Sequence, residues 1–224
     1  RLTASPHVIH IFGFCGQSAL TEFADDKRLG ELADKKRNVK RARLEIARDI
    51  ATGLADVHGI DGDDYATFVH LDINPANVVS IDGTLKLNDF NIGVLRKWNI
   101  TSNEPCGISV KYPNPQWRSP EEARREHTLT EKVDVFSLGH ILFRLVCGHE
   151  PWHKLEENGQ LPPKDVLNEN VQRGVLPRIP DSVMRSSDPE IIAIREAMLR
   201  CYTYDPVLRP SAREIANFLQ NALD

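Results

Sequence analysis

The stretch of residues 134–146 sets the strictest condition on how this chain folds, because its apolar side chains cover nearly every face of a helix. A helix that is apolar on all sides is buried in a protein or in a membrane. This stretch contains His140 and Arg144 and is shorter than the roughly 20 residues that a membrane span needs. We therefore expect a helix at the centre of a helical lobe, and no membrane insertion. Its apolar residues are Val135, Phe136, Leu138, Ile141, Leu142, Phe143, Leu145 and Val146.

The composition is that of one globular domain. With 224 residues, 41% of them hydrophobic and 27% charged, the chain has enough apolar side chains to bury one sizeable core. A formal net charge of -4 and the lack of Lys/Arg runs argue against nucleic acid as a partner. The cysteines are scattered without a CxxC pair, which predicts neither a zinc site nor a disulfide framework and fits an intracellular, cytoplasmic setting. The sequence gives no indication of oligomeric state.

Upstream of the buried helix, the pattern predicts strands followed by an amphipathic helix. Apolar runs at 8–14 and 19–23 predict two strands around a turn at Gly16-Gln17. Apolar residues at helical spacing predict a one-faced helix over 39–58.

Downstream, serine residues mark helix starts. Ser119 precedes Pro120 and two acidic residues, as an N-cap does. Ser187 and Ser211 each stand three residues before a glutamate, which is the spacing of a capping box. Helices are therefore expected to fill the second half of the chain.

A hairpin between residues 77 and 88 carries the first chemical signal. Two β-type runs flank Asp82-Gly83, a strong two-residue hairpin turn. Closing this turn brings Asn77 opposite Asn88 and Asp89, with cross-strand neighbours about 5 Å apart. Oxygen ligands grouped in this way suit Mg²⁺. The alternative is that these residues only end strands and begin turns, as Asn and Asp often do.

Five motifs, in order, give the chain a resemblance to the catalytic domain of eukaryotic-type protein kinases. They are His70-Leu71-Asp72 with Asn77 in the catalytic loop (70–77), Asp89-Phe90-Asn91 in the metal-binding turn (89–91), Ser119-Pro120-Glu121 at the end of the activation segment (89–121), Asp134 with Gly139 in the central helix, and Asp205 with Arg209-Pro210 near the end. The resemblance implies an α+β fold: a mainly α-helical C-terminal lobe with small β-hairpins and a remnant of the N-terminal lobe sheet. It divides the chain into 1–24, the remnant with the hinge, and 25–224, the C-terminal lobe.

The resemblance also implies a reaction. It is transfer of the γ-phosphoryl group of ATP to a hydroxyl of a protein substrate, with Ser/Thr favoured over Tyr by general abundance. Asp72 would orient the hydroxyl and accept its proton, while Asn77 and Asp89 would hold the Mg²⁺ ions that bridge the ATP phosphates. Asn74 stands in the catalytic loop where Ser/Thr kinases usually carry Lys.

An adenine site is implied in the first third of the chain. It comprises Thr21 as gatekeeper, Glu22, Phe23 and Ala24 as the hinge, and Leu29 and Val79 as one side of the adenine sandwich.

Two structural contacts are implied as well. His70 is expected to pack on Phe90. Glu121 and Arg209 are expected to form a buried ion pair, the alternative being two exposed charges worth well under about 1 kcal/mol.

Several residues depart from the family pattern. Leu71 replaces the Arg that often receives a phosphate from the activation segment, and Asn91 replaces a Gly. Asn tolerates positive φ better than most residues, so the turn is expected to survive. Hydroxyls that a kinase could phosphorylate in the activation segment are Thr101, Ser102, Ser109 and Tyr112.

Two alternatives to an active protein kinase remain open. The chain lacks a Gly-rich loop and the Lys-bearing strand that follows it; we expect these to lie before Arg1 in a longer protein, which could be membrane-tethered. Without them the domain would be a pseudokinase or a binding module. A small-molecule phosphotransferase of the aminoglycoside-kinase type shares the His-x-Asp-x₄-Asn loop but generally lacks the later motifs.

Overall fold

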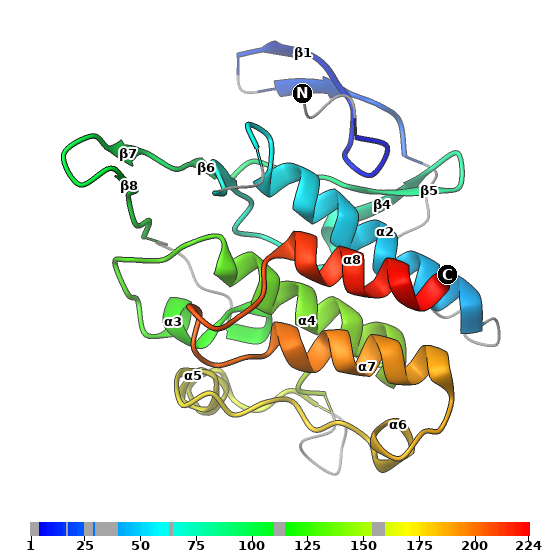
Figure 1. Cartoon of the computed structure of the whole chain (residues 1–224). Coiled ribbons are helices and arrows are strands. Elements are labelled where there is room, and N and C mark those ends of the chain that lie inside the picture. Colours follow the sequence, from blue (N-terminus) through cyan, green and yellow to red (C-terminus); the bar gives the residue numbers. More distant parts are fainter. Residues whose placement is uncertain are drawn as a thin grey trace.

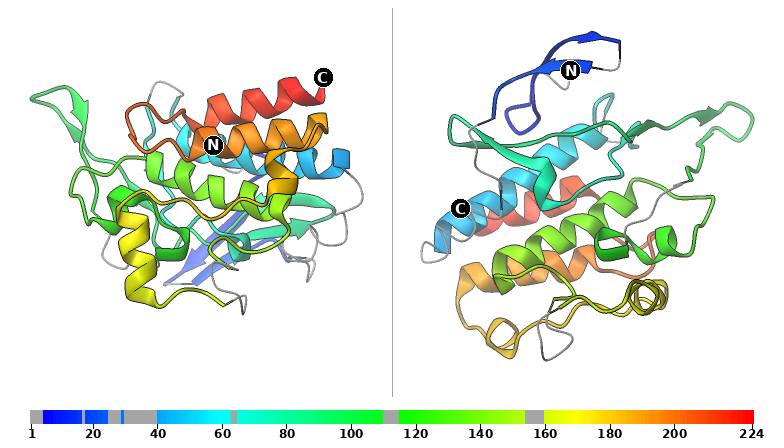
Figure 2. Two further views of the ribbon diagram at one scale, coloured as in Figure 1. Left: turned by 90° about the horizontal axis from the view of Figure 1, so that it is seen from below. Right: turned by 180° about the vertical axis from the view of Figure 1, so that it is seen from behind.

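The structure is a computed structural model, and it describes residues 5–16, 18–24, 29, 40–62, 65–109, 115–153 and 160–224. A body of helices carries several two-stranded antiparallel sheets, and the β1–β2 hairpin lies at one end of this body (Figure 1). The fold is therefore α+β and mainly helical, as the sequence predicts. The β7–β8 hairpin projects away from the body in both further views (Figure 2).

The elements have the following bounds. The strands are β1 (Ile11–Cys15), β2 (Ser18–Thr21), β3 (Phe68–Val69), β4 (Val78–Ile81), β5 (Thr84–Leu87), β6 (Val94–Leu95), β7 (Trp98–Asn99) and β8 (Glu104–Pro105). The helices are α2 (Lys40–His58), α3 (Pro120–Ala123), α4 (Lys132–Cys147), α5 (Lys164–Gln172), α6 (Asp181–Met184), α7 (Pro189–Cys201) and α8 (Ala212–Leu223), with 3₁₀ turns η2 (Pro75–Asn77) and η3 (Pro115–Trp117).

Helix α4 forms the centre of the hydrophobic core. Every residue from 133 to 146 in this helix is buried, which confirms the prediction made from its all-round apolar surface. It packs against α7, while α2 packs against α8 (Figure 1). Among the described residues, no helix is long and apolar enough to span a membrane.

The β1–β2 hairpin confirms the two strands expected near the N-terminus. Its strands are antiparallel, and the register shifts between Ile11 and Gly13. Just before β1, the chain docks on β5, because Ile9 N donates to Leu87 O at 2.9 Å and Leu87 N donates to His7 O at 2.9 Å. These bonds place the hairpin over β4 and β5.

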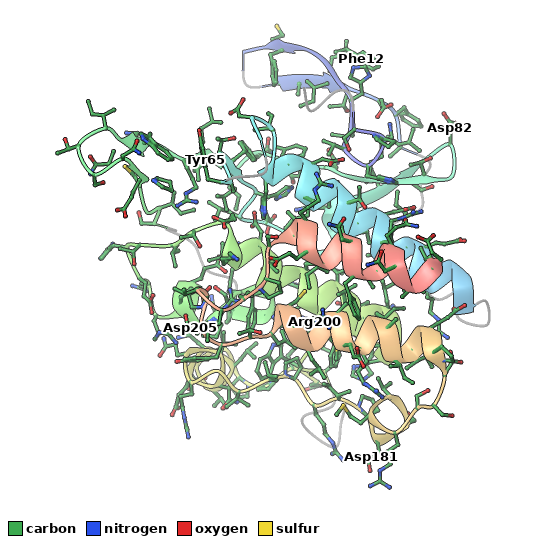
Figure 3. The ribbon with its side chains drawn as sticks, in the orientation of Figure 1. Phe12, Tyr65, Asp82, Asp181, Arg200 and Asp205 are labelled. Carbon is green, nitrogen blue, oxygen red and sulfur yellow. The ribbon has the colours of Figure 1, made fainter. Side chains whose placement is uncertain are left out.

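The β4–β5 hairpin also follows the prediction. Val78 pairs with Leu87, and the turn residues Asp82 and Gly83 have φ of 50° and 79°. Positive φ at both central residues is the type I′ geometry that Asp-Gly favours. Asp82 lies at the tip of this turn (Figure 3).

The predicted helix starts are confirmed at two positions and wrong at a third. Ser119 and Ser211 each form a complete capping box. At α7 the N-cap is Asp188 instead of Ser187, and its side chain accepts from Glu190 N. Asp caps as well as Ser does, and here it immediately precedes a proline at the first helical position.

The predicted ion pair between Glu121 and Arg209 is present and buried. Arg209 Nη1 lies 2.7 Å from Glu121 Oε1, and the two residues are 1% and 2% exposed. This pair joins α3 to the loop before α8.

Candidate functional site

A buried carboxylate at the start of α4 anchors the loop 70–77. Asp134 is 1% exposed, and it accepts the backbone N–H groups of His70 at 2.7 Å and of Leu71 at 2.8 Å. His58 Nε2 lies 3.0 Å from the same carboxylate. Burial raises the pKa of Asp134, but the hydrogen bonds and charges of His58 and His70 together outweigh burial and leave the pKa below its ordinary value. The carboxylate thus bonds the backbone of a neighbouring loop.

The residue before Asp72 has a strained backbone. Leu71 has a φ of 64°, in the left-handed region that non-glycine residues rarely occupy. Its N–H is held by Asp134, and its carbonyl accepts from Arg118 Nη1. Strain of this kind persists only where the surroundings over-determine it, and it is frequent at functional sites.

The carboxylate of Asp72 is held through both of its oxygens. Asn77 Nδ2 donates to Asp72 Oδ2 at 2.8 Å and to the Asp72 carbonyl at 2.9 Å. Arg118 Nη2 lies 3.5 Å from Asp72 Oδ1. The side chain is nevertheless 34% exposed. It is therefore oriented and still reachable by a hydroxyl group, as a general base must be.

The side chain of Asn74 forms hydrogen bonds within the loop 70–77. Its side chain donates to the Asp72 carbonyl at 3.1 Å and accepts from Ala76 N at 2.9 Å, so it caps η2. Both ends of the side-chain amide are thereby engaged with the loop backbone.

The β4–β5 hairpin brings Asn77 and the turn 89–91 together. Asn88 N donates to Asn77 O at 2.9 Å, which places Asn77 opposite Asn88 as predicted. Asp89 follows with a φ of 63°. The sequence predicts a positive φ at Asn91, but the positive φ lies two residues earlier, at Asp89. The N–H of Asn91 donates to Asp89 Oδ1 at 3.4 Å.

The expected contact between His70 and Phe90 is present. Their ring centroids are 4.8 Å apart. His70 Nε2 also lies 3.0 Å from the Asn88 carbonyl. His70 thus ties the loop 70–77 to the start of the turn 89–91.

A cavity of about 790 Å³ lies between the β1–β2 hairpin and the turn 89–91. Three of the predicted site residues, Thr21, Asn77 and Asp89, line it, and Asp72 joins them through its hydrogen bond to Asn77. The other lining residues are Val8, Ile9, Ile11, Phe14, Ser18, Ala19, Phe68, Ala76, Asn88, Phe90 and Asn91. Mixed apolar and polar walls of this kind are typical of small-molecule sites.

Most of the residues expected around adenine do not line this cavity. Glu22, Phe23, Ala24, Leu29 and Val79 are absent from the described lining of the cavity. Leu29 is fully buried in the core, whereas Phe23 is 90% exposed. The predicted adenine site and the division at residue 24 stay predictions.

Glu22 is engaged at the base of the hairpin. Its carboxylate lies 2.7 Å from Lys86 Nζ and accepts from His10 N at 2.8 Å. Burial raises the pKa of Glu22, but the hydrogen bonds from Lys86 and His10 and the Lys86 charge together leave it below its ordinary value. The Glu22 side chain thus fixes the hairpin to β5.

The donor set at the mouth of the β4–β5 hairpin fits a hard cation. Asp89 offers a carboxylate, and Asn77 offers its amide oxygen because its amide nitrogen already bonds Asp72. In the described part of the chain, no cluster of three or more His, Cys, Asp or Glu side chains is arranged to hold a metal. One carboxylate with few protein ligands is the usual donor set for Mg²⁺, which keeps waters and binds substrate phosphates.

The sequence from residue 1 to residue 218 matches the family described as the protein kinase domain. The chain belongs to the protein kinase family. This match confirms the resemblance seen in the five motifs and the kinase-like fold class.

Several kinases are similar to this kinase domain. It is 30% identical over 182 residues to the serine/threonine-protein kinase CTR1 of Arabidopsis thaliana, covering 81% of this chain and 19% of that protein. It is 29% identical over 175 residues to a mitogen-activated protein kinase kinase kinase of Pyricularia oryzae, covering 76% of this chain and 10% of that protein. It is 26% identical over 236 aligned positions to a leaf rust 10 disease-resistance locus receptor-like protein kinase-like protein of Arabidopsis thaliana. This match covers 96% of this chain and 36% of that protein. The kinase domain thus spans a minor part of these relatives.

Sequence reasoning missed Arg118 and Glu122 in this kinase domain. Both are buried, at 4% and 2% exposure, and Arg118 Nη1 lies 3.3 Å from Glu122 Oε1. The available signal was the spacing of four residues between an Arg and a Glu around a helix start, which allows an ion pair. The contact of Arg118 with Asp72 has no such local signal.

The buried Glu122 of the kinase domain makes stability depend on pH. Burial raises the pKa of Glu122 to about 7 from 4.5, although Arg118 and Ser119 act in the opposite direction. Because the folded pKa is the higher one, this group stabilises the fold fully below 4.5, and that contribution is lost as the pH rises through about 7. Relative to Glu122→Gln, wild type is expected to lose on the order of 2 kcal/mol between about pH 4.5 and pH 7.5. Urea unfolding at both pH values measures the free energy of unfolding of the two proteins. The same difference between wild type and Glu122→Gln at both pH values would contradict this prediction.

Proposed function

We propose that this protein is an ATP-dependent protein kinase that phosphorylates Ser or Thr hydroxyls of a protein substrate. The observation that carries the proposal is the linked arrangement of three residues. Asp72 is hydrogen-bonded to Asn77, and Asn77 lines one cavity with Asp89. A carboxamide and a carboxylate that line one cavity, with a base hydrogen-bonded to the carboxamide, suit phosphoryl transfer, since positioning and charge neutralisation dominate this reaction.

Each residue has a role in the proposed reaction. The substrate oxygen bonds to the γ-phosphorus of ATP, the bond to the β–γ bridging oxygen breaks, and ADP leaves. Asp72 accepts the proton of the hydroxyl group, and its fixed carboxylate orients that group. Asn77 and Asp89 would hold Mg²⁺, which supplies positive charge against the phosphates when it is bound.

The preference for Ser/Thr and the cellular setting are part of this proposal. One similar protein is named a serine/threonine-protein kinase, and another is named a mitogen-activated protein kinase kinase kinase. The four cysteines, Cys15, Cys106, Cys147 and Cys201, are free thiols. Free thiols fit a reducing environment, so we place the kinase domain inside the cell.

A pseudokinase is the second candidate, and Asn74 favours it. The amide of Asn74 bonds the loop backbone at both ends and brings no charge to the phosphates. Positive charge at such a position is often worth about 10²-fold or more in rate. A domain of this kind could bind Mg²⁺-ATP without transferring phosphate.

One experiment separates these functions. The full-length protein is incubated with Mg²⁺ and ATP labelled in the γ-phosphate, together with a general protein substrate or with an aminoglycoside. We expect labelled phosphoserine or phosphothreonine on the protein, dependent on Mg²⁺ and lost in Asp72→Asn. Nucleotide binding without transfer would indicate a pseudokinase, and label on the aminoglycoside would indicate a small-molecule phosphotransferase.

A further inference from the structure

The geometry points to Arg118 as a positioning residue for the proposed base. We infer that its buried guanidinium holds the Leu71 carbonyl and the Asp72 carboxylate at once, and so fixes the direction in which Asp72 faces the substrate. This inference rests on the proposed function, in which Asp72 is the base. It gives the residues around Arg118, at the end of the activation segment, a direct part in ordering the catalytic loop.

The contacts of Arg118 are those of a clamp. Nη1 donates to the carbonyl of Leu71 and also lies 3.3 Å from Glu122 Oε1. Nη2 lies 3.5 Å from Asp72 Oδ1. Only 5% of the Arg118 side chain is exposed, whereas 34% of the Asp72 side chain is. The cation is therefore shielded from water, whereas the carboxylate it contacts is partly exposed to solvent.

The strained residue beside Asp72 shows why such a clamp is needed. Leu71 has a φ of 64°, and a non-glycine residue keeps a conformation of this kind only where its surroundings hold it. Two buried charged side chains bind its polar backbone groups, since Asp134 takes the N–H and Arg118 takes the carbonyl. Because Asp72 is the next residue, the peptide plane that Arg118 holds sets the starting direction of the Asp72 side chain.

The chemistry of the guanidinium suits this role. Its planar fork presents five N–H donors, so one side chain can bind a carbonyl and two carboxylates together. A Lys ammonium is a point charge on a flexible stem and cannot reproduce the fork. Within the described residues, Arg118 is the cation that forms an ion pair with Asp72. Since Asn74 brings no charge, the positive charge at Asp72 comes from the activation segment.

A second anchor holds Arg118 from the other side. Glu122 accepts from Ser119 N at 2.9 Å and from Ser119 Oγ at 3.0 Å within the capping box of α3. Its other oxygen contacts Arg118. The α3 cap therefore fixes the guanidinium, which in turn fixes Asp72. Displacing this segment would leave the Asp72 carboxylate with Asn77 as its remaining described side-chain partner.

The test compares Arg118→Ala with Arg195→Ala in the full-length protein. Arg195 is a matched control, because its guanidinium also binds backbone carbonyls, those of Val183 and Met184, but contacts no residue of the catalytic loop. For Arg118→Ala we expect kcat to fall roughly 10²-fold, as a misplaced catalytic group can cause, with the Kd for Mg²⁺-ATP changed less than about twofold. Added guanidinium at tens of millimolar is expected to restore part of the lost kcat, whereas ammonium at equal concentration is not.

The outcomes separate this inference from the proposed function. If wild type transfers no phosphate, the proposed function fails first. If wild type is active and Asp72→Asn is not, but Arg118→Ala keeps kcat within about twofold, Arg118 has no positioning role and only this inference fails. Equal loss of kcat and nucleotide binding, with no guanidinium rescue, would show a merely structural role and would also overturn it. Should Arg118→Ala not fold, Arg118→Lys decides: full activity contradicts the fork argument, and a loss of kcat at unchanged Kd supports it.

Discussion

Replacing Asp89 by Asn is expected to reduce Mg²⁺-dependent phosphoryl transfer by about 10³-fold. The change keeps the shape of the side chain and removes the one carboxylate that lines the described cavity. A metal ion contributes several kcal/mol of charge stabilisation, and each 1.36 kcal/mol corresponds to a factor of ten in rate. The measurements are kcat with labelled ATP and the Mg²⁺ concentration needed for half-maximal rate, which is expected to rise.

The same hairpin offers a matched control for this change. Asp82 is exposed at the turn, with a φ of 50° that Asn also tolerates. Asp82→Asn removes an identical charge at the opposite end of the β4–β5 hairpin, so kcat is expected to stay within about twofold. If Asp89→Asn retains wild-type transfer with an unchanged Mg²⁺ requirement, Asp89 holds no metal and the proposed chemistry of the site is wrong.

The parts of the site that the sequence predicted are those set by local structure. The Asp-Gly turn fixes the register of the β4–β5 hairpin within a few residues, and this register brings Asn77 to Asn88. The buried helix α4 was predictable for a similar reason, since its apolar pattern lies in one continuous stretch. Roles such as those of Asp72 and Asp89 came from the family resemblance instead of from spacing.

The parts that the sequence did not predict depend on contacts between distant segments. Arg118 meets Leu71 across 47 positions of the chain, and Asp134 meets His70 across 64 positions. No periodicity links such residues, because the fold alone brings them together. The positive φ at Asp89 in place of Asn91 also lies beside such a contact, since His70 bonds the carbonyl of the preceding residue, Asn88, across 18 positions.

Arg209→Ala is expected to destabilise the fold by about 3–5 kcal/mol, because it leaves a buried carboxylate without its partner. Besides Glu121, the guanidinium bonds the carbonyls of Thr203 at 2.8 Å, Lys132 at 2.6 Å and Tyr204 at 3.2 Å. It also lies over the ring of Phe136, 4.9 Å from its centroid. The substitution therefore leaves the buried Glu121 carboxylate unpaired and removes one hydrogen bond from each of three partly buried carbonyls, which adds to the cost.

Thermal unfolding tests this directly. For a domain of this size, we expect Tm to fall on the order of 10 °C. Arg185→Ala is the control, since Arg185 pairs with Asp181 at 3.6 Å with both side chains more than 80% exposed, and an exposed pair contributes roughly 0–1 kcal/mol. The double variant Glu121→Gln with Arg209→Met removes both charges, and it is expected to recover part of the loss because no buried charge stays unpaired. Equal Tm values for Arg209→Ala and Arg185→Ala would show that this ion pair does not hold the activation segment to the helical body.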